Sequence, residues 1–431
     1  MSAKSVAGLL LGAVMCAPVA AGYFNPALVQ GIGSAQANPA FLAGPDRPGF
    51  ACRILDAGVG FDNNSFTAGQ FNRYSGAWLD DAVKTDILTS IPGAGLRLAA
   101  KGGASAVEFG WANLAAWLRT ELHGRVTVPR ELFELALEGN QLDRQYRVTQ
   151  AEAIGFAFAR AGLGVATALG ANFAVGAGIS YLYGLGCAEL TSARAGLLTT
   201  AGEISADGRV GYRTAAGGSG WALNAGIAGW HDDWRFGLAA REIGSGITWN
   251  REVTEAAYSF DLEPGNAFAI RAERHFSHEL ASSPGARFVT RLPLRFELSL
   301  GRSFASWFSA GLVGGPRLRV ADQPGAKTAA LSPSGWDVRG VVEFLPLDWL
   351  PVSCHLGYDS ETGGGVGGAI GLLLGRFFFA PRAEYRGLDP ADTRDGLLFT
   401  GRGFDIGLSV SYEDRRRRAA PEELHIYYGG D

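Results

Sequence analysis

One stretch of the chain, AGLGVATALGANFAVGAGISYLYGLG (residues 161–186), carries no charged side chain. It is long enough for a transmembrane helix, which needs about 20 apolar residues. Its side chains alternate, however: most odd positions are large and apolar, and the even positions are short side chains, except Leu182. A period of two is typical of β-strands, whereas a helix would lose roughly 1 kcal/mol at each glycine relative to alanine. We therefore predict a hairpin of two strands that turns near residues 170–172.

The same alternation recurs later in the chain. In RFVTRLPLRFELSLG (residues 287–301) the even positions from Phe288 onward are apolar except Thr290, and the odd positions include Arg291, Arg295 and Glu297. Comparable segments lie at residues 268–276, 377–386 and 404–412. The strands of a transmembrane β-barrel and those of a water-soluble β-sandwich both alternate in this way, so the period alone does not decide between these two architectures.

Two further features favour a membrane barrel over a sandwich. The polar face carries neighbouring charges of opposite sign while the apolar face is nearly uncharged, and tryptophans flank polar turns, as in WHDDW (residues 230–234). Aromatic girdles and strands of about 10 alternating residues are typical of transmembrane barrels. A closed barrel also pairs every backbone group in lipid without helices. The 62 glycines, about twice the average share, fit closely packed backbones and many turns.

We therefore predict an all-β fold, a closed antiparallel transmembrane β-barrel of about 14 strands, because bacterial single-chain barrels favour even numbers. The sequence contains more candidate strands than such a barrel needs as full spans. They cover residues 50–61, 105–114, 153–169, 173–186, 208–216, 219–230, 233–243, 254–262, 266–276, 287–302, 304–313, 336–345, 351–359, 366–375, 376–386, 395–400 and 403–412.

Two segments show helical spacing instead. Residues 78–91 place apolar side chains three or four positions apart and stop before Pro92, and residues 129–139 start at Pro129 and end at Gly139. Both are too short and too charged to span lipid. We expect these short helical inserts in a plug inside the barrel or as a cap at one mouth, with or without a role in gating.

The two ends of the chain indicate export and a charged tail. The first residues, MSAKSVAGLLLGAVMCAPVAAG, combine Lys4, an apolar run and the small residues Val19, Ala20 and Ala21, which is the layout of a secretory signal peptide cleaved near Ala21. At the other end, Arg415 to Arg418 follow the last candidate strand. This run could touch anionic headgroups or a partner, or be a solvated end.

The segment YFNPALVQGIGSAQANPAFLAG (residues 23–44) resembles the N-terminal hatch of the long-chain fatty-acid outer-membrane transporter family. In that family a segment of small residues leads into Asn-Pro-Ala before the first strand, and Asn38, Pro39 and Ala40 occupy the matching positions here. Residues 63–92 also look like a segment of uncharacterised barrel relatives of the family. The resemblance implies a barrel with an N-terminal plug in the bacterial outer membrane and passage of hydrophobic molecules. The helical insert and the basic tail depart from the family pattern.

The resemblance divides the chain into a signal peptide (1–21), a hatch or plug (22–49), the barrel (50–412) and a charged C-terminal tail (413–431). Pro39 fixes its own φ and disfavours helical backbone at Asn38, whose side chain can then form an Asx turn. We predict Asn38, Pro39 and Ala40 as the gate. Phe41, Leu42 and Phe50 are the candidate ligand contacts beside it.

The charged face of the strands predicts the lining of the lumen. Opposite charges there could cross-link a filled interior as a structural network or line a water path as a selectivity filter. The predicted lumen-lining residues are Arg271, Glu273, Arg291, Arg295, Glu297, Arg339, Glu343, Arg382, Glu384 and Arg386.

Other classes of function find little support. The net charge of −4 argues against a nucleic-acid partner, the six histidines are dispersed, and neither a Gly-x-Ser-x-Gly nor a His-Glu-x-x-His motif is present. We predict no catalytic residues, no metal and no cofactor. The predicted function is passage of small hydrophobic molecules across the outer membrane through a plugged barrel, with membrane lipid around it. The alternative is a non-transporting barrel that docks an envelope or secretion partner.

Overall fold

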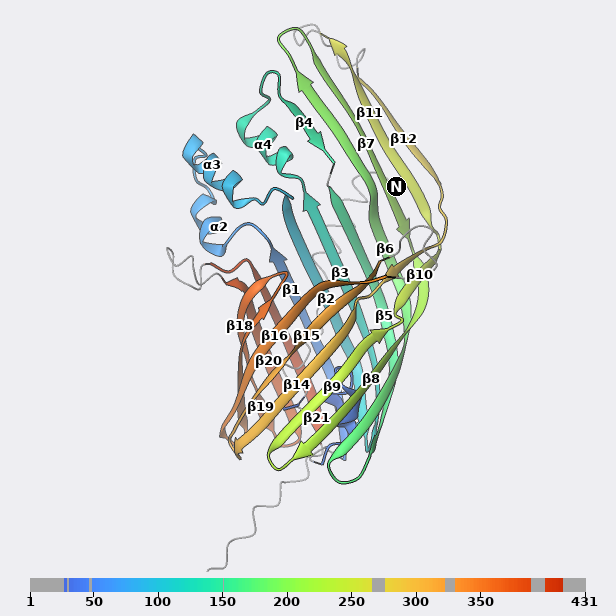
Figure 1. Ribbon diagram of the computed structural model, residues 1–431, viewed down its shortest axis with the longest axis vertical. Coiled ribbons are helices and arrows are strands. Elements are labelled where there is room, and N and C mark those ends of the chain that lie inside the picture. Colours follow the sequence, from blue (N-terminus) through green and yellow to red (C-terminus); the bar gives the residue numbers. More distant parts are fainter. Residues whose placement is uncertain are drawn as a thin grey trace, which may run out of the picture.

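The computed structural model describes residues 27–28, 31–45, 49–149, 151–265, 276–321, 330–388 and 400–413. In this part of the chain, 14 antiparallel strands close into a barrel (Figure 1). Closure is direct, because β1 (Phe50–Asn63) pairs on one side with β2 (Leu96–Trp111) and on the other with β21 (Gly403–Glu413), the last strand. The predicted fold class is confirmed.

The remaining strands of the wall follow in chain order. They are β3 (Leu114–Val128), β5 (Glu152–Ala168), β6 (Phe173–Thr199), β8 (Gly217–His231), β9 (Trp234–Ile243), β14 (Leu294–Ala305), β15 (Phe308–Ala321), β16 (Ala330–Leu347), β17 (Leu350–Asp359), β18 (Gly363–Ile370) with β19 (Leu372–Leu374), and β20 (Phe377–Leu388). Tight turns such as residues 112–113 and 232–233 join neighbours at the lower end in Figure 1.

The uncharged stretch is a hairpin, as predicted. Strands β5 and β6 pair from Ala168 opposite Ala174 upward, and Gly170 in the turn has φ of 81°, which glycine adopts without strain. The large odd-numbered side chains face outward: Leu163 is 63% exposed. The one large even-numbered residue, Leu182, is fully buried inside. The alternation of large and small side chains therefore distinguishes the outer surface of the barrel from its interior.

Several strand predictions were wrong. The strand predicted over residues 304–313 is interrupted by the turn at residues 306–307, and two further cases have a clear physical cause. No strand was predicted over residues 115–152, yet β3 occupies Leu114–Val128. The strand was missed because its inward side chains are largely charged and lower its hydropathy. Residues 287–302 were predicted as one strand, but Pro293 separates β13 (Phe288–Arg291) from β14. The break reverses the facing: Phe288 is buried, whereas Leu298, of the same parity, is 63% exposed.

At the end opposite the tight turns, part of the wall continues as a free-standing sheet (Figure 1). The upper half of β6 pairs with β7 (Ile204–Ala215), which pairs with β11 (Thr254–Gly265), which pairs with β12 (Phe276–Pro284). The short strand β4 (Gln145–Val148) adds to the other edge of β6. Strand β10 (Gly246–Arg251) joins β8 to β13 at the base of this sheet.

Short helices lie at the same end (Figure 1). They are α2 (Ala68–Tyr74), α3 (Asp81–Ser90) and α4 (Arg130–Glu138), close to the two predicted helical segments. The side chain of Asp80 begins α3 by accepting a hydrogen bond from the backbone N–H of Val83 at 2.9 Å. Of the two expected places, a plug inside the barrel and a cap at one mouth, the helices lie at a mouth (Figure 1). Among the described residues no helix is both long and apolar enough to cross a membrane.

The outer surface of the barrel wall is apolar and is flanked by aromatic side chains. Trp111 and Trp307 lie beside the tight turns, and Trp221 packs against Tyr181 farther along the strands, with ring centroids 5.1 Å apart. Leu163 lies on the strand between these levels, and exposed apolar side chains surround it. Such a surface is suited to acyl chains rather than to water.

We expect Leu163→Arg to lower the free energy of unfolding by about 2–4 kcal/mol, since an arginine facing the middle of the bilayer must be desolvated. Denaturant unfolding of the protein in lipid vesicles measures the loss. Leu142→Arg is the control, because Leu142 is similarly exposed but lies in a loop between α4 and β4. An equal, small effect of both substitutions would contradict an outward lipid-facing wall.

Candidate functional site: the hatch and the charged lumen

The N-terminal segment lies inside the lower part of the barrel as two short 3₁₀ turns, η1 (Gly31–Gly33) and η2 (Pro39–Ala43). Asn38 precedes η2 with extended backbone (φ −143°, ψ 102°), and its Oδ1 accepts a hydrogen bond from the N–H of Ala40 at 3.0 Å. This is the Asx-type turn expected from Asn-Pro-Ala. The residues of η2 are buried.

Asn38 also joins the hatch to the wall. Its Nδ2 donates to the carbonyl oxygen of Ile227 on β8 at 3.0 Å and approaches that of Leu238 on β9 at 3.5 Å. The side chain is 1% exposed, so these bonds do not compete with bulk water. One amide therefore fixes both the local turn and its attachment.

Glycines of the wall make room for the hatch. A Cβ placed on Gly237 would lie 2.7 Å from both Asn38 Nδ2 and Phe41 Cε2, and one on Gly301 would lie 2.8 Å from Leu28 Cδ2. Real Cβ contacts are not this short. The small-residue face that the sequence shows on several strands is therefore, at these positions, a seat that lets the backbone of the wall approach the hatch.

The hatch also contacts the wall through an apolar cluster. Phe41 and Leu42 are buried with Trp117 of β3 and Trp230 of β8, and the ring centroids of Phe41 and Trp230 are 6.3 Å apart, edge to face. Phe50 does not join them, contrary to the sequence prediction. It is 41% exposed and its ring lies 6.2 Å from that of Tyr412, because the first residue of β1 points outward.

A buried polar network holds the other side of the hatch. Gln36 Nε2 donates to Glu108 Oε1 at 2.7 Å, and the guanidinium of Arg119 donates to Gln36 Oε1. Glu108 in turn accepts from Arg53 Nη1 at 2.5 Å and from Ser105 Oγ at 2.7 Å. Strands β1, β2 and β3 thus contribute to one hydrogen-bonded cluster that ends on the hatch.

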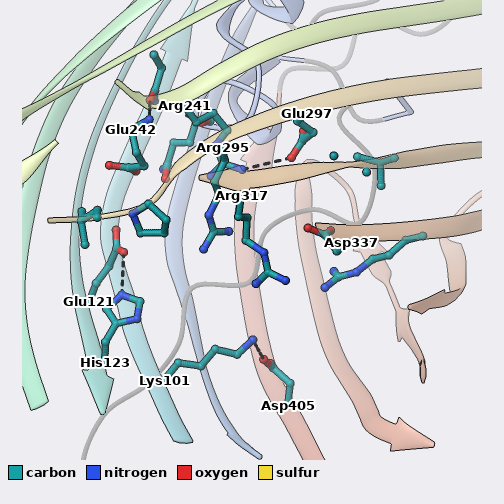
Figure 2. Close-up of a pocket in the computed structure, with 18 of the residues that line it drawn as sticks. Lys101, Glu121, His123, Arg241, Glu242, Arg295, Glu297, Arg317, Asp337 and Asp405 are labelled. Carbon is teal, nitrogen blue, oxygen red and sulfur yellow. Dashed lines mark hydrogen bonds and ion pairs between the residues drawn. The ribbon is translucent and has the colours of Figure 1, made fainter. Parts of the chain in front are cut away.

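Above the hatch the lumen contains a cavity of about 320 Å³ lined mainly by charged side chains, with Gln36 in its wall (Figure 2). Most of the predicted lumen residues line it. They are Arg295, Glu297, Arg339, Arg382, Glu384 and Arg386. They are cross-linked: Arg386 Nε lies 3.1 Å from Glu384 Oε1, and Arg382 Nη2 lies 2.9 Å from Asp56 Oδ1.

The other predicted lumen residues differ in their placement. Glu343 is on β16, on the same face as Arg339 but outside the cavity lining. Arg291 was predicted wrongly: it is exposed on β13, opposite in facing to the buried Thr290, because the chain bends at Pro293. Arg271, Glu273 and the tail residues Arg415 to Arg418 lie outside the described residues.

Several lumen residues were not predicted. Arg160 of β5 bridges Glu121 of β3 at 3.0 Å and Glu242 of β9 at 2.8 Å, and its side chain is 6% exposed. For Glu121, the sequence does contain a signal, because polar and apolar side chains alternate over residues 117–125 of β3. The low hydropathy of this segment prevented its prediction as a strand. Among the described residues no group of three His, Cys, Asp or Glu side chains gathers in a way that could hold a metal ion.

A closed antiparallel barrel with an apolar outer surface and an internal hatch belongs to the class of outer-membrane β-barrels. The chain belongs to the family described as Family of unknown function (DUF5723), which matches residues 53–380. No curated protein matches it in sequence.

Several solved structures are similar in fold. The toluene transporter TbuX of Ralstonia pickettii is 10% identical, with 89% of this chain and 94% of that chain covered and a TM-score of 0.49. A FadL homologue of Pseudomonas aeruginosa is 12% identical, with 90% and 95% covered and a TM-score of 0.47. The toluene transporter TodX of P. putida is 10% identical, with 89% and 94% covered and a TM-score of 0.45.

Proposed function

We propose that this protein carries small hydrophobic molecules across the outer membrane through a barrel that its N-terminal hatch closes, and that residues 1–21 direct its export. The observation that carries the proposal is the apolar cluster of Phe41, Leu42, Trp117 and Trp230 at the contact between hatch and wall. A hatch held by this cluster and a few hydrogen bonds can separate from the wall without breaking any strand pairing.

The lumen is chemically different at the level of the hatch and above it, which supports an apolar site at the hatch. Glycine and alanine on β5, β6 and β8 adjoin the hatch and Trp117. The charged network lines the cavity above the hatch and reaches around the lumen, from Glu121 of β3 and Arg160 of β5 to Arg382 and Arg386 of β20. A small apolar molecule at the hatch would lose water against this apolar surface without desolvating the ion pairs above it. We assign Phe41 and Leu42 as its contacts and Asn38, Pro39 and Ala40 as the gate.

Flux through the intact protein tests the proposal. We expect vesicles containing the full-length protein to take up toluene faster than empty vesicles, while their swelling in arabinose stays at the level of empty vesicles. The reason is that the hatch fills the lower lumen against polar solutes. Equal toluene uptake with and without correctly inserted protein would refute apolar passage.

A docking role for an envelope partner is a second candidate. The observation that favours it is the free-standing sheet, in which every residue of its edge strand β12 is exposed. An unpaired strand edge can accept a strand of another protein. Retention of a specific envelope protein by the full chain, lost when residues 254–284 are deleted, would support this role, and a barrel closed to all solutes would favour it over transport.

A further inference from the structure

Three arginines lie side by side on neighbouring strands of the lumen. Arg295 of β14 is directly opposite Arg241 of β9 on one side and directly opposite Arg317 of β15 on the other. All three line the cavity above the hatch, and Figure 2 shows their side chains reaching into the same space. Like charges placed directly opposite each other destabilise a sheet. Their arrangement therefore requires a counter-charge.

The carboxylates of the wall supply this counter-charge for the outer two arginines. Arg241 Nη1 lies 3.4 Å from Glu297 Oε2, and Arg317 Nη2 lies 2.7 Å from Asp359 Oδ2. Among the described residues the side chain of Arg295 has no ion-pair or hydrogen-bond partner. The carboxylates of Glu242 and Asp337 line the same cavity as the three arginines. The middle of the row therefore carries a positive charge that faces the cavity without a direct ion pair in the described part of the chain.

We propose that the row formed by Arg241, Arg295 and Arg317 binds a small oxyanion, a phosphoryl or carboxylate group, in the lumen. A guanidinium presents paired N–H donors in a planar fork that matches two oxygens of such a group. The cavity of about 320 Å³ has room for a small anion, and charged side chains make up most of its lining, with Trp117, Leu292, Phe296 and Val313 as its larger apolar members. The ligand is therefore a compact polar anion rather than an amphiphile with an apolar tail.

The site adjoins the hatch. Gln36 lines the same cavity and is hydrogen-bonded to Arg119, which also lines it. A bound anion would thus sit above the hatch and compete with Gln36 for nearby cationic donors. This proposal concerns binding and does not depend on the passage of apolar molecules, so either can fail alone.

Titration calorimetry of the full-length protein in dodecyl maltoside tests the site, with inorganic phosphate, acetate and octanoate as probes in separate titrations. We expect saturable binding of phosphate, of acetate or of both, and a loss of affinity of about tenfold or more in Arg295→Gln, because a charge-assisted bidentate contact is removed. The stronger of the two probes identifies the oxyanion. Arg302→Gln, on the same strand with its guanidinium over Trp234, is the control and should bind as the wild type does.

Thermal unfolding gives a second, independent readout. Without an oxyanion, Arg295→Gln should be as stable as the wild type or more stable, since it relieves repulsion within the row. Phosphate or acetate should raise the Tm of the wild type and of Arg302→Gln but not that of Arg295→Gln. Arg295→Lys, which keeps the charge and loses the fork, should bind with intermediate affinity.

Three results would overturn the proposal. The first is no saturable binding of either small oxyanion to the folded wild type. The second is unchanged affinity in folded Arg295→Gln. The third is octanoate binding far more tightly than acetate, because that would assign the site to an apolar tail.

Discussion

Removal of residues 22–40 is expected to raise the permeability of the barrel to small polar solutes several-fold while leaving the strands paired. The deleted segment contains Asn38 and Gln36, through which the hatch is hydrogen-bonded to β2, β3, β8 and β9. The wall itself closes through β1 and β21, and neither strand is within the deletion. Swelling of vesicles in arabinose measures the change.

A single substitution should reproduce part of this effect. In Asn38→Ala the turn before η2 loses its cap and the bond to Ile227, so the hatch is held mainly by Gln36 and the apolar cluster. The control is Asn64→Ala, because Asn64 Nδ2 also bonds a backbone carbonyl, that of Gly95 at 3.1 Å, but at the opposite end of the barrel. Unchanged swelling rates in a correctly inserted deletion variant would refute the hatch as the barrier.

The sequence predicted the wall well because lipid imposes one simple rule on it. Wherever a strand has acyl chains on one side, its outward residues are large and apolar, as Leu163 and Leu298 are, and the period of two is visible without knowledge of the partner strand. The strands that were missed or misjudged break the rule. Inward charges lower the hydropathy of β3, and Pro293 changes the facing within what looked like one strand.

The inside of the barrel was less predictable, because its contacts join residues far apart in the chain. Asn38 was identified from its local motif, but its bond to Ile227 depends on how the chain closes. The sequence shows that position 237 is a glycine, but it does not show that the ring of Phe41 occupies the space beside it. The parity of Arg295 and Arg317 predicts only that they face the lumen, and the strand register brings them opposite each other.

The buried ionic cluster beside the hatch leads to the largest expected loss of stability. Glu108 is 1% exposed and Arg53 is 3% exposed, and their charged atoms are 2.5 Å apart. Glu108→Ala leaves the Arg53 charge buried with Asp56, 3.4 Å away, as its remaining carboxylate in this cluster. Breaking one partner of a buried pair lowers the free energy of unfolding by about 3–5 kcal/mol. Denaturant unfolding followed by tryptophan fluorescence measures it.

Two further variants separate the effect of the Glu108 charge from that of its hydrogen bonds and from the effect of breaking any ion pair. Glu108→Gln keeps an acceptor for Gln36 and Ser105, so its loss should be smaller, and its swelling rate should stay below that of Glu108→Ala, which releases Gln36 of the hatch. Glu138→Ala breaks an exposed pair with Arg144 at 3.3 Å and should lose less than about 1 kcal/mol. If Glu108→Ala were no less stable than Glu138→Ala, the cluster would not support the barrel, and the hatch would have to be held by Asn38 and the apolar cluster alone.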